Sequence, residues 1–183
     1  GTPAIAETIM IERDLRLLEY TGGRYHVAQV SCEASVEIIR RAKTRGLGVT
    51  CGVSAAHLQL NENDVQSYRT FFKLSPPLRT EQDRLALVAG LADGTIDVIV
   101  SSHDPQDPEV KRRPFAEANF GAIGLETLLP AGLALVHNGD LPLGRFLAAL
   151  TSIPSDLLGL GRGRLATGLP ADLVLIDTEG PWK

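Results

Sequence analysis

The sequence predicts an α/β fold built around a parallel β-sheet. Three short apolar segments alternate with stretches whose apolar residues recur at helical spacing. Glycine-containing turns, such as Gly46-Leu47-Gly48 and Asp93-Gly94, separate the segments. Strands that alternate with helices in this way run parallel and are joined by right-handed crossovers. The expected strands are Tyr25–Val30, Val49–Val53 and Ile96–Ser101.

The helices are predicted from apolar spacing and from the residues at their ends. Residues 4–20 have helical spacing and stop at Thr21-Gly22-Gly23. Ser31 is expected to cap a helix over residues 33–45. Thr80 is expected to cap a helix over residues 80–92, which has acidic residues in its first turn. The remaining expected elements are helices over residues 122–136 and 143–150, and an isolated strand at Leu173–Asp177.

Composition excludes several classes of protein. The chain has 183 residues and a net charge of −4, and Lys111-Arg112-Arg113 is its only basic triplet, which argues against nucleic-acid binding. Its apolar runs are too short or too interrupted to cross a bilayer, and no signal peptide is visible. Two cysteines make no disulfide framework at this length. These features together predict a cytoplasmic location.

Two architectures fit alternating strands and helices: an open doubly wound sheet, or part of a (β/α)₈ barrel. The loops after the three strands contain no glycine-rich phosphate turn, which disfavours dinucleotide binding. A complete barrel takes about 250 residues, and three strands cannot close one. The chain is therefore an open sheet or the C-terminal part of a barrel. In the second case, residues 1–160 supply the late barrel elements and residues 161–183 begin a small β segment.

Several motifs follow one another along nearly the whole chain. They are GTPAIAE at residues 1–7, YHVAQVS at 25–31, KLSPPLR at 73–79, GTIDVIVSSHDPQ at 94–106, NFGAIGLET at 119–127, and the tail from Gly163 to Asp177. In this order the motifs resemble those of dihydroorotases of the long-chain bacterial type, within the amidohydrolase superfamily. The resemblance implies the C-terminal portion of a TIM-type metal-dependent hydrolase barrel.

The resemblance also implies a chemistry. Dihydroorotases open and close a cyclic amide, converting dihydroorotate to and from carbamoyl aspartate in pyrimidine biosynthesis. Such a reaction calls for a metal, zinc in this family, that polarises the amide carbonyl and lowers the pKa of a bound water. A carboxylate at the end of the last strand would carry the proton.

Two family ligand positions are substituted in this chain. Gln29 stands where the family has the second histidine of its YHxxHxS strand, and Ser102 stands at the aspartate that also serves as proton carrier. A neutral amide and a neutral hydroxyl are weak metal ligands, so we expect no metal to be held by this chain. Strand alternation places His26 on the face opposite Gln29, which would prevent His26 from replacing it.

The substrate positions implied by the family are partly retained. Ser75 stands at the asparagine of the KxNPPLR loop, and Gln106 at the last histidine of the TDHAPH motif. Phe120 and Gly121 keep the family's backbone contact positions. Half of these four positions are therefore substituted, in addition to both ligand positions.

The other chemically versatile residues have simpler structural interpretations. His26 is expected to be packed or hydrogen-bonded between the strand and the helices, and His57 to lie in a surface loop. His103 and Asp104 are adjacent, so they would point apart rather than form a catalytic pair. His137 is expected at the C-terminus of a helix. Cys32 and Cys51 are expected to be buried free thiols.

Two hypotheses follow. The first is an inactive dihydroorotase homologue, a pseudoenzyme that acts as a structural or regulatory partner of aspartate transcarbamoylase. The second is an active zinc-dependent dihydroorotase whose ligands lie mainly in an N-terminal half. In either case a partial barrel would expose inward residues, which we expect to include Val27, Val98 and Val100. Self-association or an N-terminal half of the barrel should then cover them.

Overall fold

The computed structural model describes residues 2–180 and contains the expected three-stranded parallel sheet. Its strands are β1 (Tyr25–Val27), β2 (Val49–Ser54) and β3 (Val98–Val100), with β2 in the centre. The first and last strands are shorter than the sequence predicts. Beyond β1 the chain still lies beside β2, because the Val30 amide donates to the Gly52 carbonyl at 2.9 Å.

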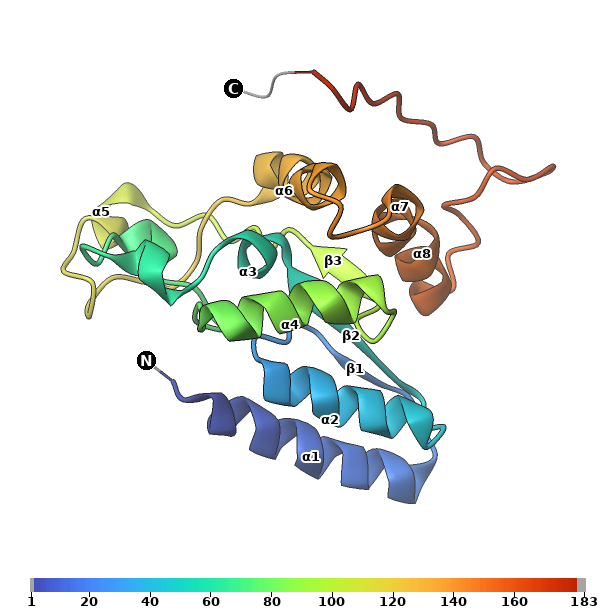
Figure 1. Cartoon of the computed structure of the whole chain (residues 1–183), viewed down its shortest axis with the longest axis horizontal. Helices are drawn as coiled ribbons and strands as arrows, with labels where there is room; N and C mark the ends of the chain where they lie inside the picture. The colour runs from blue at the N-terminus through green and yellow to red at the C-terminus, as the bar shows by residue number, and fades with distance from the viewer. Residues whose placement is uncertain (1, 181–183) are drawn as a thin grey trace.

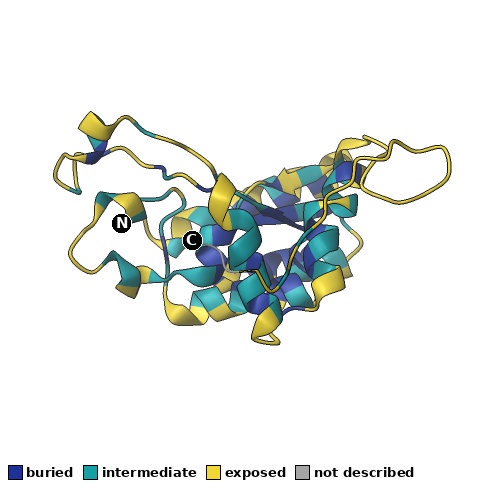
Figure 2. Cartoon of the chain, turned by 90° about the horizontal axis from the view of Figure 1, so that it is seen from above, coloured by how far each residue is buried: buried dark blue, intermediate teal, exposed yellow. Residues whose placement is uncertain are grey.

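Helices pack round one face of this sheet. Figure 1 shows α1, α2 and α4 lying side by side, with α6 and α7 toward the C-terminal end of the fold. The dark residues in Figure 2 lie between the helices and the strands, which is where the core sits. The helices are α1 (Ala4–Thr21), α2 (Glu33–Thr44), α3 (Ala55–Gln59), α4 (Glu81–Ala92), α5 (Pro108–Lys111), α6 (Leu125–His137), α7 (Leu143–Leu150) and α8 (Ser152–Leu158).

One of the two predicted helix caps is confirmed, and the other is wrong. At α4 the Thr80 hydroxyl accepts from the Asp83 amide while the Asp83 carboxylate accepts from the Thr80 amide, as a capping box requires. The prediction that Ser31 caps α2 is wrong, because Cys32 occupies the cap position and makes no side-chain cap bond. The Ser31 hydroxyl instead donates to the Glu7 carboxylate of α1.

The helix-facing side of the sheet forms the core. Val27, Val53 and Ile99 belong to one apolar cluster with helical side chains such as Phe146. Two of the residues that were expected to be exposed are instead buried. Val27 is only 8% exposed because it faces the helices, and Val98 is only 5% exposed.

The opposite face of the sheet carries small and polar residues of β1 and β2 together with Val98 and Val100 of β3. His26 and Thr50 are paired across β1 and β2, and the His26 Nδ1 lies 2.8 Å from the Thr50 Oγ1. A Cβ at Gly52 would lie 2.7 Å from the Ala28 carbonyl oxygen, so only glycine fits there. His26 is exposed, which corrects the expectation that it packs between strand and helices.

The C-terminal segment has no strand in the part of the chain that the structure describes. Leu173–Asp177 is not paired with any described strand, so the predicted isolated strand is wrong. Leu173, Val174 and Leu175 are all exposed, since no neighbouring backbone or apolar surface meets them. The division of the chain at about residue 160 stays a prediction.

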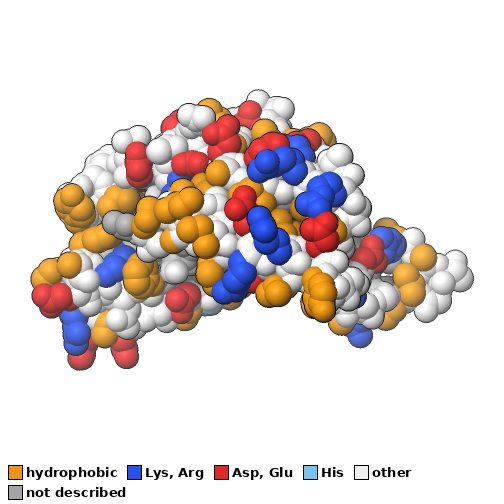
Figure 3. Space-filling view, turned by 90° about the horizontal axis from the view of Figure 1, so that it is seen from below, with side chains coloured by type: hydrophobic (Ala, Val, Ile, Leu, Met, Phe, Trp, Pro, Cys, Tyr) orange, Lys and Arg blue, Asp and Glu red, His pale blue; other side chains and the backbone are white. Residues whose placement is uncertain are grey.

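The outer surface of α1 carries a row of apolar side chains. Figure 3 looks from below onto the side where α1 lies, and orange side chains gather there beside a mixed group of acidic and basic ones. The exposed apolar residues of α1 are Ile5, Ile9, Met10, Leu17 and Tyr20. Within residues 2–180 no helix is both long and apolar enough to span a membrane.

Candidate functional site

Gln29 and Ser102 meet beyond the ends of β1 and β3. The Ser102 Oγ donates a hydrogen bond to the Gln29 Oε1 at 3.2 Å, and both residues are half-buried. Parallel strands bring their carboxyl ends to one edge of a sheet, so residues 73 positions apart in the sequence become neighbours. The two family ligand positions thus converge on one point, but the groups there are a neutral amide and a neutral hydroxyl.

Strand alternation does not decide what Gln29 faces. Pairing in β1 stops at Val27, and the chain beyond it turns so that the Gln29 side chain reaches Ser102. Alternation therefore places His26 correctly opposite Val27 but does not extend to Gln29. His26 lies on the face opposite the helices, and its imidazole is paired with Thr50.

The donor set at this point does not fit a metal ion. Among residues 2–180, no group of three or more histidine, cysteine, aspartate or glutamate side chains is arranged to hold one. Gln29 and Ser102 bring no negative charge that would offset the dehydration of a dication. The Gln29 oxygen and the Ser102 hydroxyl also already hydrogen-bond to each other. The residues of this chain therefore provide hydrogen bonding here rather than metal coordination.

Two of the four expected substrate positions lie on one cavity. Ser75 and Phe120 line a cavity of about 970 Å³ between the loops that follow β2 and β3. Lys73 joins these loops: its ammonium lies 4.9 Å from the centre of the Phe120 ring, and its carbonyl accepts from the Gly121 amide at 2.9 Å. Gly121 has a φ of +111°, a conformation that favours glycine.

Gln106 is separated from that cavity. Its side-chain nitrogen donates to the Asp104 carboxylate at 2.8 Å, and its oxygen accepts from the Asn119 amide at 3.3 Å. It lines a different cavity, between α3 and α6. The structure thus brings Ser75 and Phe120 together and places Gln106 on the far side of the loop.

His57 is buried, which corrects its expected place in a surface loop. It lies in α3 with 3% of its surface exposed, and its Nε2 is 3.1 Å from the Pro76 carbonyl oxygen and 3.2 Å from that of Pro77. Burial lowers the pKa of the imidazole, so the neutral form with the proton on Nε2 fits these contacts. His57 therefore fixes the loop that carries Ser75.

His103 and Asp104 do not form a pair. The His103 Nδ1 accepts from the Gly124 amide at 3.1 Å and so ties the chain after β3 to the start of α6. The Asp104 carboxylate accepts from Gln106 instead. His137 is the last residue of α6, as expected. Cys32 and Cys51 are both buried free thiols, and burial raises the pKa of Cys51 to about 12.

A polar network next to Gln29 was missed by reasoning from the sequence. The Glu7 Oε1 accepts from the Ser31 amide at 2.9 Å and from the Ser35 hydroxyl at 2.6 Å. The Arg79 Nε donates to the Ser31 hydroxyl at 3.1 Å. These contacts join α1, the chain after β1 and the KLSPPLR loop. The signal that could have revealed the network is that Glu7, Ser31 and Arg79 each stand in one of the quoted motifs.

Curated relatives match the chain from end to end. The dihydroorotase of Anaplasma phagocytophilum (strain HZ) is 48% identical over 183 residues, and that of Pelobacter propionicus is 46% identical over 182 residues. Each match covers 100% of this chain but only 41% and 43% of the relative, so the chain spans about two fifths of their length. No family model matches the chain.

Solved structures agree on the fold. The L-hydantoinase (dihydropyrimidinase) from Arthrobacter aurescens is 31% identical, superimposes with a TM-score of 0.88, and is matched over 93% of this chain and 39% of its own. The inactive dihydroorotase-like domain of the Chaetomium thermophilum CAD-like multifunctional protein shares the fold with a TM-score of 0.62 at 24% identity, over 81% of this chain and 41% of that one. Over its whole length, the chain is therefore homologous to the C-terminal part of dihydroorotases, with the fold of the late portion of an amidohydrolase barrel.

Proposed function

We propose that this chain belongs to a dihydroorotase homologue that has lost catalysis and acts in pyrimidine biosynthesis as a non-catalytic partner. The hydrogen bond between Ser102 and Gln29 carries the proposal. A hydrolytic metal centre needs negative or imidazole ligands and a base for the proton, whereas these positions offer an amide oxygen and a hydroxyl of ordinary acidity. The supporting barrel frame is otherwise retained, as the homology of the whole chain indicates.

The test uses the full-length protein. We expect the unmodified protein to contain less than stoichiometric zinc and to show no turnover of dihydroorotate above background. Gln29→His combined with Ser102→Asp restores an imidazole and a carboxylate at the point where the side chains already meet, so metal content should rise. Elemental analysis of the purified protein and an absorbance assay of ring opening measure the two quantities.

A matched control separates metal binding from substrate binding. Ser75→Asn combined with Gln106→His restores the two substituted substrate positions and leaves the ligand positions unchanged. This variant should not gain metal. Turnover of dihydroorotate by the unmodified protein with stoichiometric zinc would show that the proposal is wrong, and the alternative of an active zinc-dependent enzyme would stand.

A non-catalytic homologue acts through the proteins it binds, and we propose aspartate transcarbamoylase as that partner, in the cytoplasm. The exposed apolar residues of α1, including Ile5 and Ile9, support a protein contact on that side. The unpaired edges of β1 and β3 are suited instead to the remaining strands of the barrel or to a second copy. Co-sedimentation with aspartate transcarbamoylase, lost in Ile9→Lys and kept in Glu12→Lys, would support the α1 contact.

A further inference from the structure

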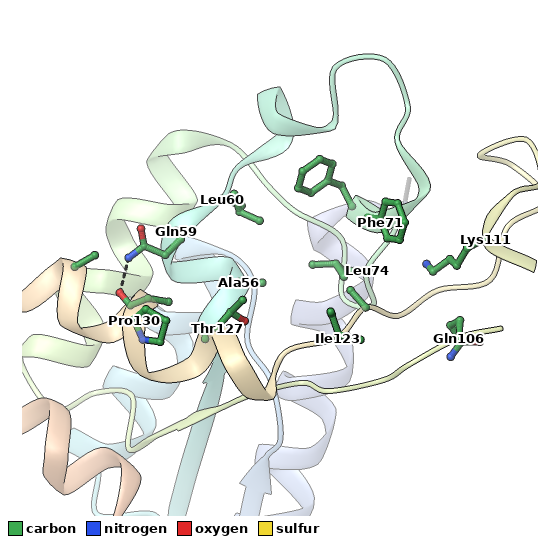
Figure 4. A pocket seen from close by; sticks show the side chains of 15 residues that line it. Ala56, Gln59, Leu60, Phe71, Leu74, Gln106, Lys111, Ile123, Thr127 and Pro130 are labelled. Carbon is green, nitrogen blue, oxygen red and sulfur yellow. Dashed lines mark hydrogen bonds between the residues drawn. The ribbon is translucent and has the colours of Figure 1, made fainter. Parts of the chain in front are cut away.

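A cavity separate from the Gln29–Ser102 pair lies between α3, α6 and the loops after β2 and β3. Its volume is about 630 Å³, within the usual range for small-molecule sites. The lining side chains are mostly alanine, leucine and phenylalanine (Figure 4). Phe71 and Ile123 line the cavity and remain 62% and 66% exposed, so its apolar wall is in contact with water.

Lys111 is the charged residue of the lining. It is only 8% exposed, and its ammonium donates to the Thr70 carbonyl at 2.9 Å and to the Asn119 carbonyl at 2.8 Å. An ammonium has three N–H donors, so one stays uncommitted. Within residues 2–180 no carboxylate forms an ion pair with it. In Figure 4 the ammonium end of Lys111 points toward the other lining side chains.

The charge of Lys111 is thus poorly solvated. Burial lowers the pKa of its ammonium, which means that the charged form lacks part of the stabilisation it has in water. Asp104 acts on it from a distance, but the Asp104 carboxylate accepts a hydrogen bond from Gln106. An anion placed beside the third N–H would supply the missing stabilisation in a site of low polarity.

We infer that this cavity binds a carboxylate with an apolar body, such as a medium-chain fatty acid. The carboxylate accepts the third N–H of Lys111, and the apolar body covers Phe71 and Ile123. Opposite charge favours an anion, and the rest of the wall, which is mostly apolar and otherwise carries only the uncharged polar side chains of Gln59, Gln106 and Thr127, favours a ligand whose only charged part is at one end. Neither Gln29 nor Ser102 lines the cavity, although Gln106, one of the expected substrate positions, does.

The test compares decanoate with decanol, which has the same chain length and no charge, by calorimetric titration of the full-length protein. Decanoate should bind more tightly than decanol. Lys111→Met keeps an unbranched side chain but removes the ammonium, and it should weaken decanoate binding by about tenfold or more while leaving decanol unchanged. Arg113→Met is the matched control, because Arg113 is exposed and does not line this cavity, and this variant should bind decanoate as the unmodified protein does.

A second variant keeps the test decisive if Lys111→Met does not fold. Ala134 lies on the α6 wall of the cavity, away from the hydrogen bonds of Lys111, and Ala134→Phe should fill the space and abolish binding of both ligands. Failure of the unmodified protein to bind decanoate would overturn the inference. Equal binding of decanoate and decanol would overturn the role of Lys111.

Discussion

The two faces of the three-stranded sheet differ in what their side chains contact. On the helix-facing side, Val53 and Ile99 are buried in one apolar cluster with Phe146. On the opposite side, His26 and Thr50 contact each other and are partly open to water. The helix-facing side therefore supplies most of the apolar packing of the segment, whereas the His26–Thr50 pair on the opposite side contributes little to it. Substitution of both ligand positions within an intact frame fits this division.

The largest effect should follow truncation in the helix-facing core. Phe146 is fully buried, and its ring lies so close to Gly132 that a Cβ there would overlap it. Phe146→Ala should lower the free energy of unfolding by about 3–5 kcal/mol, because it leaves a cavity that α6 cannot fill. Urea denaturation measures the loss. Phe71→Ala, at a residue that is 62% exposed, is the control and should cost far less.

A smaller loss is expected at the network that joins α1 to the carboxyl edge. Ser31→Ala removes the hydroxyl between Glu7 and Arg79 and leaves part of the Glu7 carboxylate without its donor. We expect a destabilisation of about 1–3 kcal/mol, the usual cost of an unsatisfied buried polar group. Ser67→Ala, at an exposed serine, should leave the denaturation midpoint unchanged. An equal effect of both substitutions would argue against the network.

His57 should make stability depend on pH. Burial lowers the pKa of its imidazole in the folded chain, so the unfolded chain binds the proton more readily. This contribution to stability is complete above the unfolded pKa of about 6.5 and is lost progressively as the pH falls toward the lower folded pKa. Each unit of pKa lowering corresponds to about 1.4 kcal/mol. His57→Gln should therefore flatten the curve of stability against pH below about pH 6.5, which urea denaturation at a series of pH values measures.

The smallest effect is expected on the face opposite the helices. Thr50→Val removes the hydroxyl that lies 2.8 Å from His26 and keeps the shape of the side chain. Because the pair is open to water, the change in stability should stay within about 0.5 kcal/mol. A loss of 2 kcal/mol or more in the full-length protein would show that this face is packed against further strands or a second copy.

The fold could be predicted from the sequence where local signals and burial agree. The caps and apolar spacing of α4 and α1 fix those helices, and the order of strands follows from alternation. Strand ends were predicted less well, because β1 stops where pairing with β2 stops, which depends on the partner strand. The tail shows the same dependence: Leu173–Asp177 has the composition of a strand, but a strand requires a neighbour.

The site was predictable only in part. The resemblance located Gln29 and Ser102, and the structure brings them to 3.2 Å. The side that Gln29 faces was predicted wrongly, because alternation within β1 cannot be extended beyond Val27, its last paired residue. The burial of His57 was also missed, since its partners Pro76 and Pro77 are contributed by a loop about 20 residues away.

Among residues 2–180, Ser102 is one of three residues other than glycine with a positive φ, at +50°. Asparagine and aspartate tolerate this conformation better than serine does, because their short polar side chains bond locally. The backbone at this point is thus still shaped for the residue type that the family has there. The substitution at this position has therefore changed the side chain but not the backbone conformation. Ser102→Asp should be accommodated without any rearrangement of the loop.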